Sequence, residues 1–119
     1  MTMNMSLPKF DALTSRFPHE QQALKGLAEL VRSSKKREMT FDHLVSWLNP
    51  RSVESLALIL AELTRAGVVT RVIRVESRTH SGIGDFASLN DIPPRMHDYS
   101  TDEEIEVTPD NLRIVYKVG

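Results

Sequence analysis

The stretch that most constrains the fold covers residues 49–75, NPRSVESLALILAELTRAGVVTRVIRV. Asn49-Pro50 ends any helix before it, because a residue that precedes proline disfavours the helical region. Ser52 is a typical N-cap, and Glu54 follows in the first turn, where the helix dipole favours a carboxylate. Gly67 lies where a left-handed C-terminal cap is expected, and the β-branched residues after it predict a strand. The stretch therefore predicts a turn, a helix and a strand, in that order.

The helix in this stretch has one strongly apolar side. Apolar residues recur at the three- and four-residue spacing of a buried helix face. We expect the inward side to consist of Val53, Leu56, Ile59, Leu60 and Leu63. The outward side then consists of Glu54, Ser55, Leu58, Ala61, Glu62 and Arg65. A helix that reads a DNA groove normally presents Arg, Lys, Asn or Gln, so the two outward carboxylates count against DNA readout.

Further elements lie on both sides of this stretch. A helix is predicted over residues 18–33, with Pro18 in its first turn and an apolar stripe along it. Thr40 is expected to cap a second helix that ends at Asn49. Residues 104–107 and 112–118 alternate between apolar and polar on either side of a Thr-Pro-Asp-Asn turn, which predicts a β-hairpin. The strand after Gly67 is expected to complete a three-stranded antiparallel sheet.

This order of elements resembles the winged helix-turn-helix superfamily over residues 18–118. The residues that carry the resemblance are TFDHLVSWLNPRSVESLALILAELTRAGVVTRVIRV: a short helix, a tight turn, a longer helix ending in Leu-x-x-Ala-Gly-Val-Val, and a strand. The resemblance implies an α+β winged helix, with a three-helix bundle and a small antiparallel β-sheet, as a single domain at residues 18–119. Residues 1–17 before it are expected to form an N-terminal arm. Residues 77–102, where the periodic pattern is lost, are expected to form a long irregular, acidic wing loop.

The wing departs from the usual basic loop of that superfamily. Residues 85–110 contain eight carboxylates and one arginine, which gives this region a net charge of −7. An acidic wing would weaken DNA binding through repulsion of the phosphates. The same region carries apolar residues, and we expect Phe86 and Tyr99 to pack back on the domain or to contact a partner. The predicted protein-interaction residues are therefore Glu54, Leu58, Ala61, Glu62, Phe86 and Tyr99.

Several positively charged residues support DNA binding as the alternative. The run Lys35, Lys36 and Arg37 precedes the second helix, where a phosphate contact is sterically conceivable. The alternative DNA-binding residues are Lys35, Lys36, Arg37, Arg51, Ser55 and Arg65. Trp47 lies beside the inward side of the second helix, which predicts burial; an exposed tryptophan there would mark an interface. Phe10, Leu13 and Phe17 could line a short helix or an arm that docks on a neighbour, and they are the candidate contact of a homodimer.

Other classes of chemistry find no support in the sequence. It contains no cysteine, which excludes disulfides and thiolate chemistry, and its histidines lack the spacing of a metal motif. No nucleophile elbow or phosphate-cradling glycine loop is present, so we expect no enzymatic activity, no cofactor and no metal site. The N-terminus lacks a signal-peptide pattern and the longest apolar stretch is too short to span a bilayer, which predicts a cytoplasmic protein without a membrane partner.

Two functions follow from these observations. The first is a small non-enzymatic winged-helix protein that acts as a protein-interaction module or adaptor subunit of a larger assembly. The alternative is a DNA-binding transcriptional regulator of the winged helix-turn-helix type. Phosphate binding should weaken steeply with salt, whereas an apolar docking surface should not, so the two functions are separable by experiment.

Overall fold

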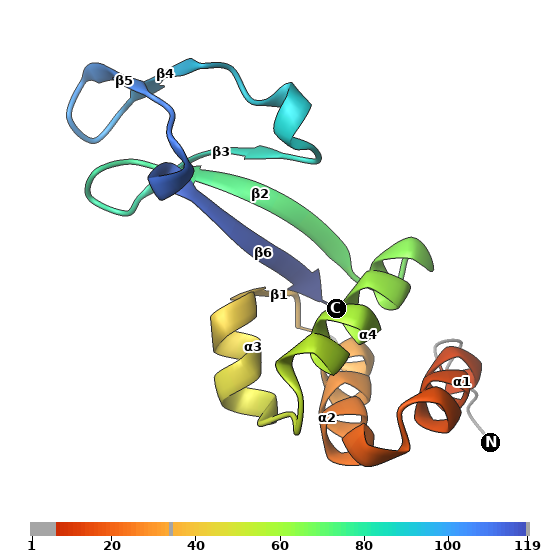
Figure 1. The fold of residues 1–119 in the computed structure, drawn as a ribbon. Helices are drawn as coiled ribbons and strands as arrows, with labels where there is room; N and C mark the ends of the chain where they lie inside the picture. Colours follow the sequence, from red (N-terminus) through yellow and green to blue (C-terminus); the bar gives the residue numbers. More distant parts are fainter. Residues whose placement is uncertain (1–6, 34, 119) are drawn as a thin grey trace. The chain divides into compact units, whose positions relative to one another are not determined.

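The computed structural model describes residues 7–33 and 35–118, and within them the protein is mixed α+β (Figure 1). Contacts group the chain into two units. The first unit holds the residues up to 70 together with those from 116 onward, and the second unit holds residues 71–115. The division between the units falls within two strands of one sheet, β2 (Thr70–Glu76) and β6 (Leu112–Val118).

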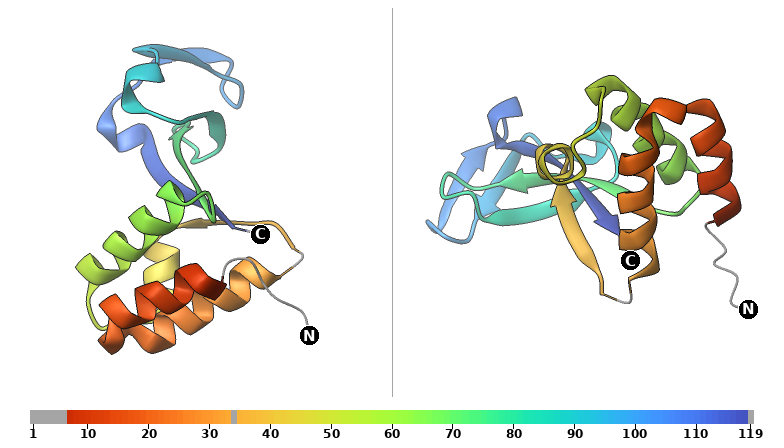
Figure 2. Two further views of the ribbon diagram at one scale, coloured as in Figure 1. Left: turned by 90° about the vertical axis from the view of Figure 1, so that its right-hand side faces the viewer. Right: turned by 90° about the horizontal axis from the view of Figure 1, so that it is seen from below.

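The first unit contains the α-helices of the described residues. They are α1 (Leu7–Arg16), α2 (Gln21–Arg32), α3 (Phe41–Leu48) and α4 (Val53–Arg65). A 3-10 helix, η1 (Pro18–Glu20), joins α1 to α2, and α1 packs beside α2 (Figure 2). The helix expected over residues 18–33 is therefore shorter and begins after a 3-10 turn. The arm predicted at residues 1–17 is helical in its described part, and residues 1–6 lie outside the described residues.

Apolar faces of α2, α3 and α4 form the core of the first unit. Leu27, Leu44, Leu56 and Leu60 are each 0% exposed. Phe10, Leu13 and Phe17 are also buried within the chain, so they are not the free dimer contact that their pattern predicted. Val53 is 49% exposed and was wrongly expected to face inward; it occupies the first turn of α4, beyond the end of the buried stripe.

The ends of the helices agree with the local sequence signals. The Thr40 hydroxyl accepts a hydrogen bond from the His43 N–H at 3.1 Å and caps α3. Asn49 ends α3 in a left-handed conformation with φ of 50°. Gly67 has φ of +77° directly after α4, where a glycine adopts the left-handed backbone without the steric cost of a side chain. The predicted boundaries at these residues are confirmed.

The strands form a four-stranded sheet and a two-stranded sheet. The order in the first is β1 (Arg37–Thr40), β6 (Leu112–Val118), β2 (Thr70–Glu76), β3 (Gly82–Phe86), and the second pairs β4 (Arg95–Asp98) with β5 (Glu103–Glu106). The predicted hairpin between residues 104–107 and 112–118 is wrong, because β5 pairs with β4 and β6 lies between β1 and β2. The sheet has four strands where three were predicted, because β1 and β3 belong to it and β5 does not.

The second unit is more ordered than the irregular loop predicted over residues 77–102. That segment contains β3, the 3-10 turn η2 (Leu89–Asp91) and β4, and η3 (Pro109–Asn111) precedes β6. Strand β3 pairs antiparallel with β2, and Arg74 binds Asp85 through two hydrogen bonds of 2.7 and 2.9 Å across this pair. The buried residues of the unit include Ile73, Val75, Ile105 and Val115.

Candidate protein-interaction surface on helix α4

A buried carboxylate fixes the turn before helix α4. Glu20 of η1 has a side chain that is 1% exposed. It accepts a hydrogen bond from the Arg51 N–H and another from the Ser52 N–H, each at 2.8 Å. The Ser52 hydroxyl accepts from the Ser55 N–H at 3.2 Å, so the N-cap predicted at Ser52 is confirmed. These bonds satisfy donors that the start of a helix leaves unpaired, which holds α4 in a defined position.

One row of residues runs along the outer side of α4. Glu54, Leu58, Ala61 and Arg65 are spaced by four, three and four residues, which places them on one face of a helix. All four are exposed, and Leu58 is 55% exposed. We call these four residues the α4 stripe. The buried residues Leu56, Ile59, Leu60 and Leu63 occupy the opposite side of the helix.

The centre of the α4 stripe is apolar and its ends are charged. Leu58 and Ala61 form the centre, and the exposed side chain of Ala57 lies one turn before Ala61. Glu54 lies near the N-terminus of α4 and Arg65 near its C-terminus, where each charge interacts favourably with the helix dipole. The surface therefore offers a partner a small apolar centre between opposite charges.

An ion-pair network borders the stripe at its C-terminal end. Glu62 Oε1 lies 3.0 Å from an Arg65 guanidinium nitrogen and 3.6 Å from one of Arg16. The Glu62 side chain is 32% exposed, so this carboxylate is partly buried. Of the predicted interaction residues, Glu54, Leu58, Ala61 and Glu62 are thus brought together on α4.

The remaining predicted interaction residues belong to the second unit. Phe86 is half-buried on β3, where it lies opposite Ile73 of β2. Tyr99 is 78% exposed after β4, and its ring stands edge-on to the His97 ring at a centroid distance of 4.8 Å. The two residues therefore have different settings, one within a sheet and the other on a turn.

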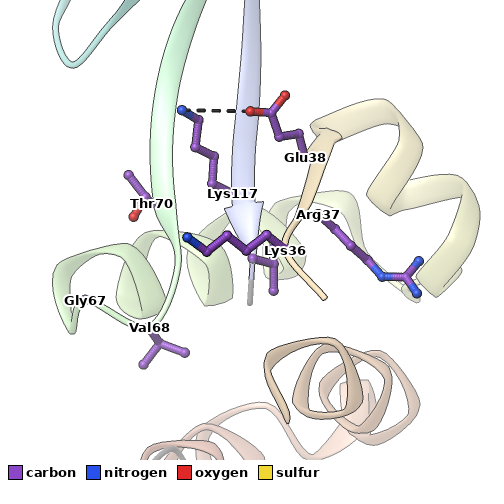
Figure 3. Close-up of a pocket in the computed structure, with 8 residues that line it drawn as sticks. Lys36, Arg37, Glu38, Gly67, Val68, Thr70 and Lys117 are labelled. Atoms are coloured by element: carbon purple, nitrogen blue, oxygen red, sulfur yellow. Dashed lines mark ion pairs between the residues drawn. The ribbon is translucent and has the colours of Figure 1, made fainter. Parts of the chain in front are cut away.

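The predicted DNA-binding residues occupy several separate settings. Lys36 and Arg37 line a hollow of about 760 Å³ in the first unit, together with Thr70 and Lys117. Figure 3 shows the Lys36 ammonium group on the Thr70 side of this hollow, whereas the Arg37 guanidinium points away from it. Lys117 lies 3.8 Å from Glu38, which partly neutralises the hollow.

The other members of that set are engaged elsewhere. The Ser55 hydroxyl lies 3.1 Å from His19 Nε2, and Arg65 pairs with Glu62. The backbone of Arg51 is bound by Glu20, and Lys35 is exposed in the segment before β1. Sequence reasoning did not anticipate Lys117 in the hollow, because nothing in the local pattern shows that β6 runs beside β1.

Trp47 is exposed, contrary to the prediction of burial. Its side chain is 51% exposed and lines a shallow hollow of about 330 Å³ with Gly26 and Leu48. A Cβ atom at Gly26 would come within 2.7 Å of Leu48 Cδ2 and 3.6 Å of the Trp47 ring. At Gly26, α2 therefore approaches the end of α3 closely.

A polar network closes the turn after β4 in the second unit. Asp98 is 0% exposed, and its Oδ1 accepts from the Ser100 N–H at 3.0 Å and the Ser100 hydroxyl at 2.6 Å. The hydrogen bond from the Ser100 hydroxyl lowers the pKa of the Asp98 carboxyl below its ordinary value of 3.8, although burial acts in the opposite direction. Thr79 contacts Ser100 at 3.1 Å and so joins the turn to the segment after β2.

No family model matches this sequence, and neither the curated proteins nor the solved structures contain a match to it. In residues 7–33 and 35–118, no three histidine or acidic side chains are grouped as metal ligands would be. No helix within the same residues has the length and apolar content needed to cross a membrane.

Proposed function

We propose that this chain is a non-enzymatic protein-interaction module of the winged-helix class, an adaptor subunit that docks through the outer side of α4. The succession of α2, α3 and α4, the glycine turn at Gly67, and β6 lying beside β2 support the winged-helix part of the proposal. A cytoplasmic location is part of the proposal, and the absence of cysteine from the sequence is in keeping with it.

The exposed composition of α4 is the observation that carries the docking role. The outer face of a surface helix usually carries charged or polar residues, yet the middle of this face holds Ala57, Leu58 and Ala61. Leu58, at 55% exposed, has the size and apolar character of an interface residue. The nearest charges are carboxylates as well as guanidinium groups, which does not suit a phosphate backbone.

The hollow beside Lys36 and Lys117 supports DNA binding as a second candidate. The ammonium groups of Lys36 and Lys117 and the Thr70 hydroxyl can all donate hydrogen bonds to phosphate oxygens. We would therefore place a contact with the DNA backbone in this hollow. Glu38, which pairs with Lys117, opposes that contact. Contacts to phosphate carry no sequence information, so any binding there would be independent of sequence.

Site-specific photocrosslinking in the cells that naturally contain the chain tests the docking role. A photoreactive phenylalanine derivative replaces Leu58 in one variant and Leu89 in a matched variant, since Leu89 is an exposed leucine (63%) of the second unit. We expect a covalent adduct with protein from position 58 and none from position 89. Equal adducts from the two positions, or none from position 58, would refute the proposal.

A DNA titration distinguishes the DNA-binding alternative from the protein-docking role. Duplex DNA should bind weakly or not at all at moderate salt if α4 is a protein-docking helix. Salt-sensitive binding that is lost in Lys36→Glu and retained in Lys25→Glu, an exposed lysine outside that hollow, would instead establish the nucleic-acid function.

A further inference from the structure

We propose that the α4 stripe docks on the α4 stripe of a second copy of this chain, forming an antiparallel, twofold-symmetric dimer. The inference rests on the proposed function, since it names the partner of the same surface. In a twofold interface the same patch serves both subunits, so each residue must suit the residue that symmetry places opposite it. The α4 stripe meets this condition at each of its positions.

The register follows from the spacing of the stripe. Residues separated by four, three and four positions have the spacing of the apolar seam in paired helices. A twofold axis midway between Leu58 and Ala61 sets Leu58 opposite the partner's Ala61. The same axis sets Glu54 opposite the partner's Arg65. No other register places all four residues of the stripe in complementary pairs.

The pairs formed in this register complement each other in size and charge. The large Leu58 side chain meets a small alanine, so the helices approach closely without a void or a clash. Each outer layer brings a carboxylate against a guanidinium group. A parallel arrangement would instead oppose Glu54 to Glu54 and Arg65 to Arg65, and like charges suppress that orientation.

Arg65 is able to reach a partner at little cost. Its side chain is 73% exposed, so it can turn outward without leaving a packed site. Glu62, its neighbour within the chain, retains Arg16 at 3.6 Å when Arg65 turns away. Glu54 likewise lies on the exposed side of the helix, where it accepts a hydrogen bond from the Ser52 hydroxyl at 3.2 Å.

The two parts of the interface have different roles. Burial of Leu58 and the alanines supplies the association energy, because exposed ion pairs add little. The charges select the antiparallel orientation. Salt should therefore weaken the dimer only slightly, which distinguishes it from a complex held by phosphates.

Charge reversal of the stripe tests the register. Sedimentation equilibrium is measured on the full chain as wild type, Glu54→Arg, Arg65→Glu and the double variant. Each single variant loses two attractions and gains two repulsions, so we expect about tenfold weaker dimerisation. The double variant restores opposite charges and should recover to within about threefold of the wild type. An equimolar mixture of the two single variants should recover equally, because both outer layers of the mixed dimer are then oppositely charged.

Matched leucine variants and a folding control complete the experiment. Leu58→Asp should reduce dimerisation by about a hundredfold or more, whereas Leu89→Asp should leave it unchanged. Circular dichroism and thermal unfolding show whether each variant keeps the wild-type helix content. If the charge variants fail to fold, the Leu58→Asp and Leu89→Asp pair still decides whether the chain pairs with itself through the α4 stripe.

The outcomes separate this inference from the proposed function. A wild-type chain that remains monomeric up to about 1 mM overturns the self-pairing. A dimer that ignores the single charge reversals, or a mixture that does not recover, overturns it as well. If the photocrosslink from position 58 then captures a different protein, the docking function stands without the dimer. If position 58 captures nothing, the docking function fails too.

Discussion

Removal of the Glu20 carboxylate should destabilise the protein far more than removal of any exposed carboxylate. Glu20 is buried and binds the N–H groups of Arg51 and Ser52, each at 2.8 Å. Hydrogen bonds to a charged group contribute about 1.5–3 kcal/mol each, and unpaired buried donors carry a desolvation penalty. Glu20→Ala removes both bonds and should cost about 3–6 kcal/mol. Glu20→Gln keeps one acceptor but turns an amide N–H toward the other backbone donor. We therefore expect it to lower the free energy of unfolding by about 2–4 kcal/mol.

Urea unfolding followed by far-ultraviolet circular dichroism measures this effect. With an m-value of about 2 kcal/mol/M, a loss of 3 kcal/mol lowers the midpoint by about 1.5 M. Glu29→Gln is the matched control, because Glu29 is exposed on α2 and its loss should change stability by less than about 0.5 kcal/mol. If Glu20→Gln and Glu29→Gln unfold at the same urea concentration, the carboxylate does not hold the turn before α4 and the reasoning fails.

Three further changes test the local physics of the fold. Gly67→Ala places a side chain at φ of +77°, so it should lower the free energy of unfolding in urea by about 1 kcal/mol. The cost is conformational, because no atom lies within 4 Å of the new Cβ, and equal stability would show that the turn relaxes. Gly26→Ala places a Cβ 2.7 Å from Leu48 Cδ2; this overpacking costs about 1–3 kcal/mol, and the higher helix propensity of alanine offsets about 1 kcal/mol of it. We therefore expect a net loss of up to about 2 kcal/mol, and a variant of higher melting temperature would contradict the close packing. The lowered pKa of Asp98 in the fold contributes stability that is fully present above the ordinary pKa of 3.8 and is lost as the pH falls through the lowered value. Asp98→Asn should therefore flatten the decline of melting temperature below about pH 4, and an unchanged decline would show that Asp98 does not contribute to it.

The helix ends were predictable because their causes are local. Thr40 and Ser52 accept hydrogen bonds from N–H groups three residues ahead, and Gly67 supplies a backbone conformation that other residues avoid. None of these signals depends on the rest of the chain. The exposure of Glu54, Leu58 and Ala61 on α4 was predictable for the same reason, since the spacing of one helix separates its two faces.

Strand pairing was not predictable, because it depends on contacts between distant segments. Residues 104–107 and 112–118 are separated by a turn-forming sequence, which favoured a hairpin. In the structure that sequence forms η3, while β5 pairs with β4 and sets Met96 opposite Ile105. Strand β4 has only four residues and little alternation, so its sequence alone carried too weak a signal.

The exposure of Trp47 and Val53 has a similar origin. Trp47 lies beside the predicted inward side of α3, and Val53 is the first residue of the predicted inward side of α4. The edge of a buried helix face cannot be located sharply from the sequence alone. Gly26 decides the matter for Trp47, because the missing side chain lets Leu48 approach α2 and leaves the larger tryptophan at the rim. Val53 is the first residue of α4, where the helix has not yet reached the core.

The packing of the fold does not explain the apolar residues on the outer face of α4. A single exposed leucine needs no special cause, because apolar atoms make up much of any protein surface. The α4 stripe differs in that its four residues would form complementary pairs about the proposed twofold axis, with leucine opposite alanine and glutamate opposite arginine. The buried side of the helix already fixes its position in the core, so lysine or glutamate at positions 57, 58 and 61 would leave the fold intact. The apolar composition of those positions is therefore best explained by a second helix that covers them.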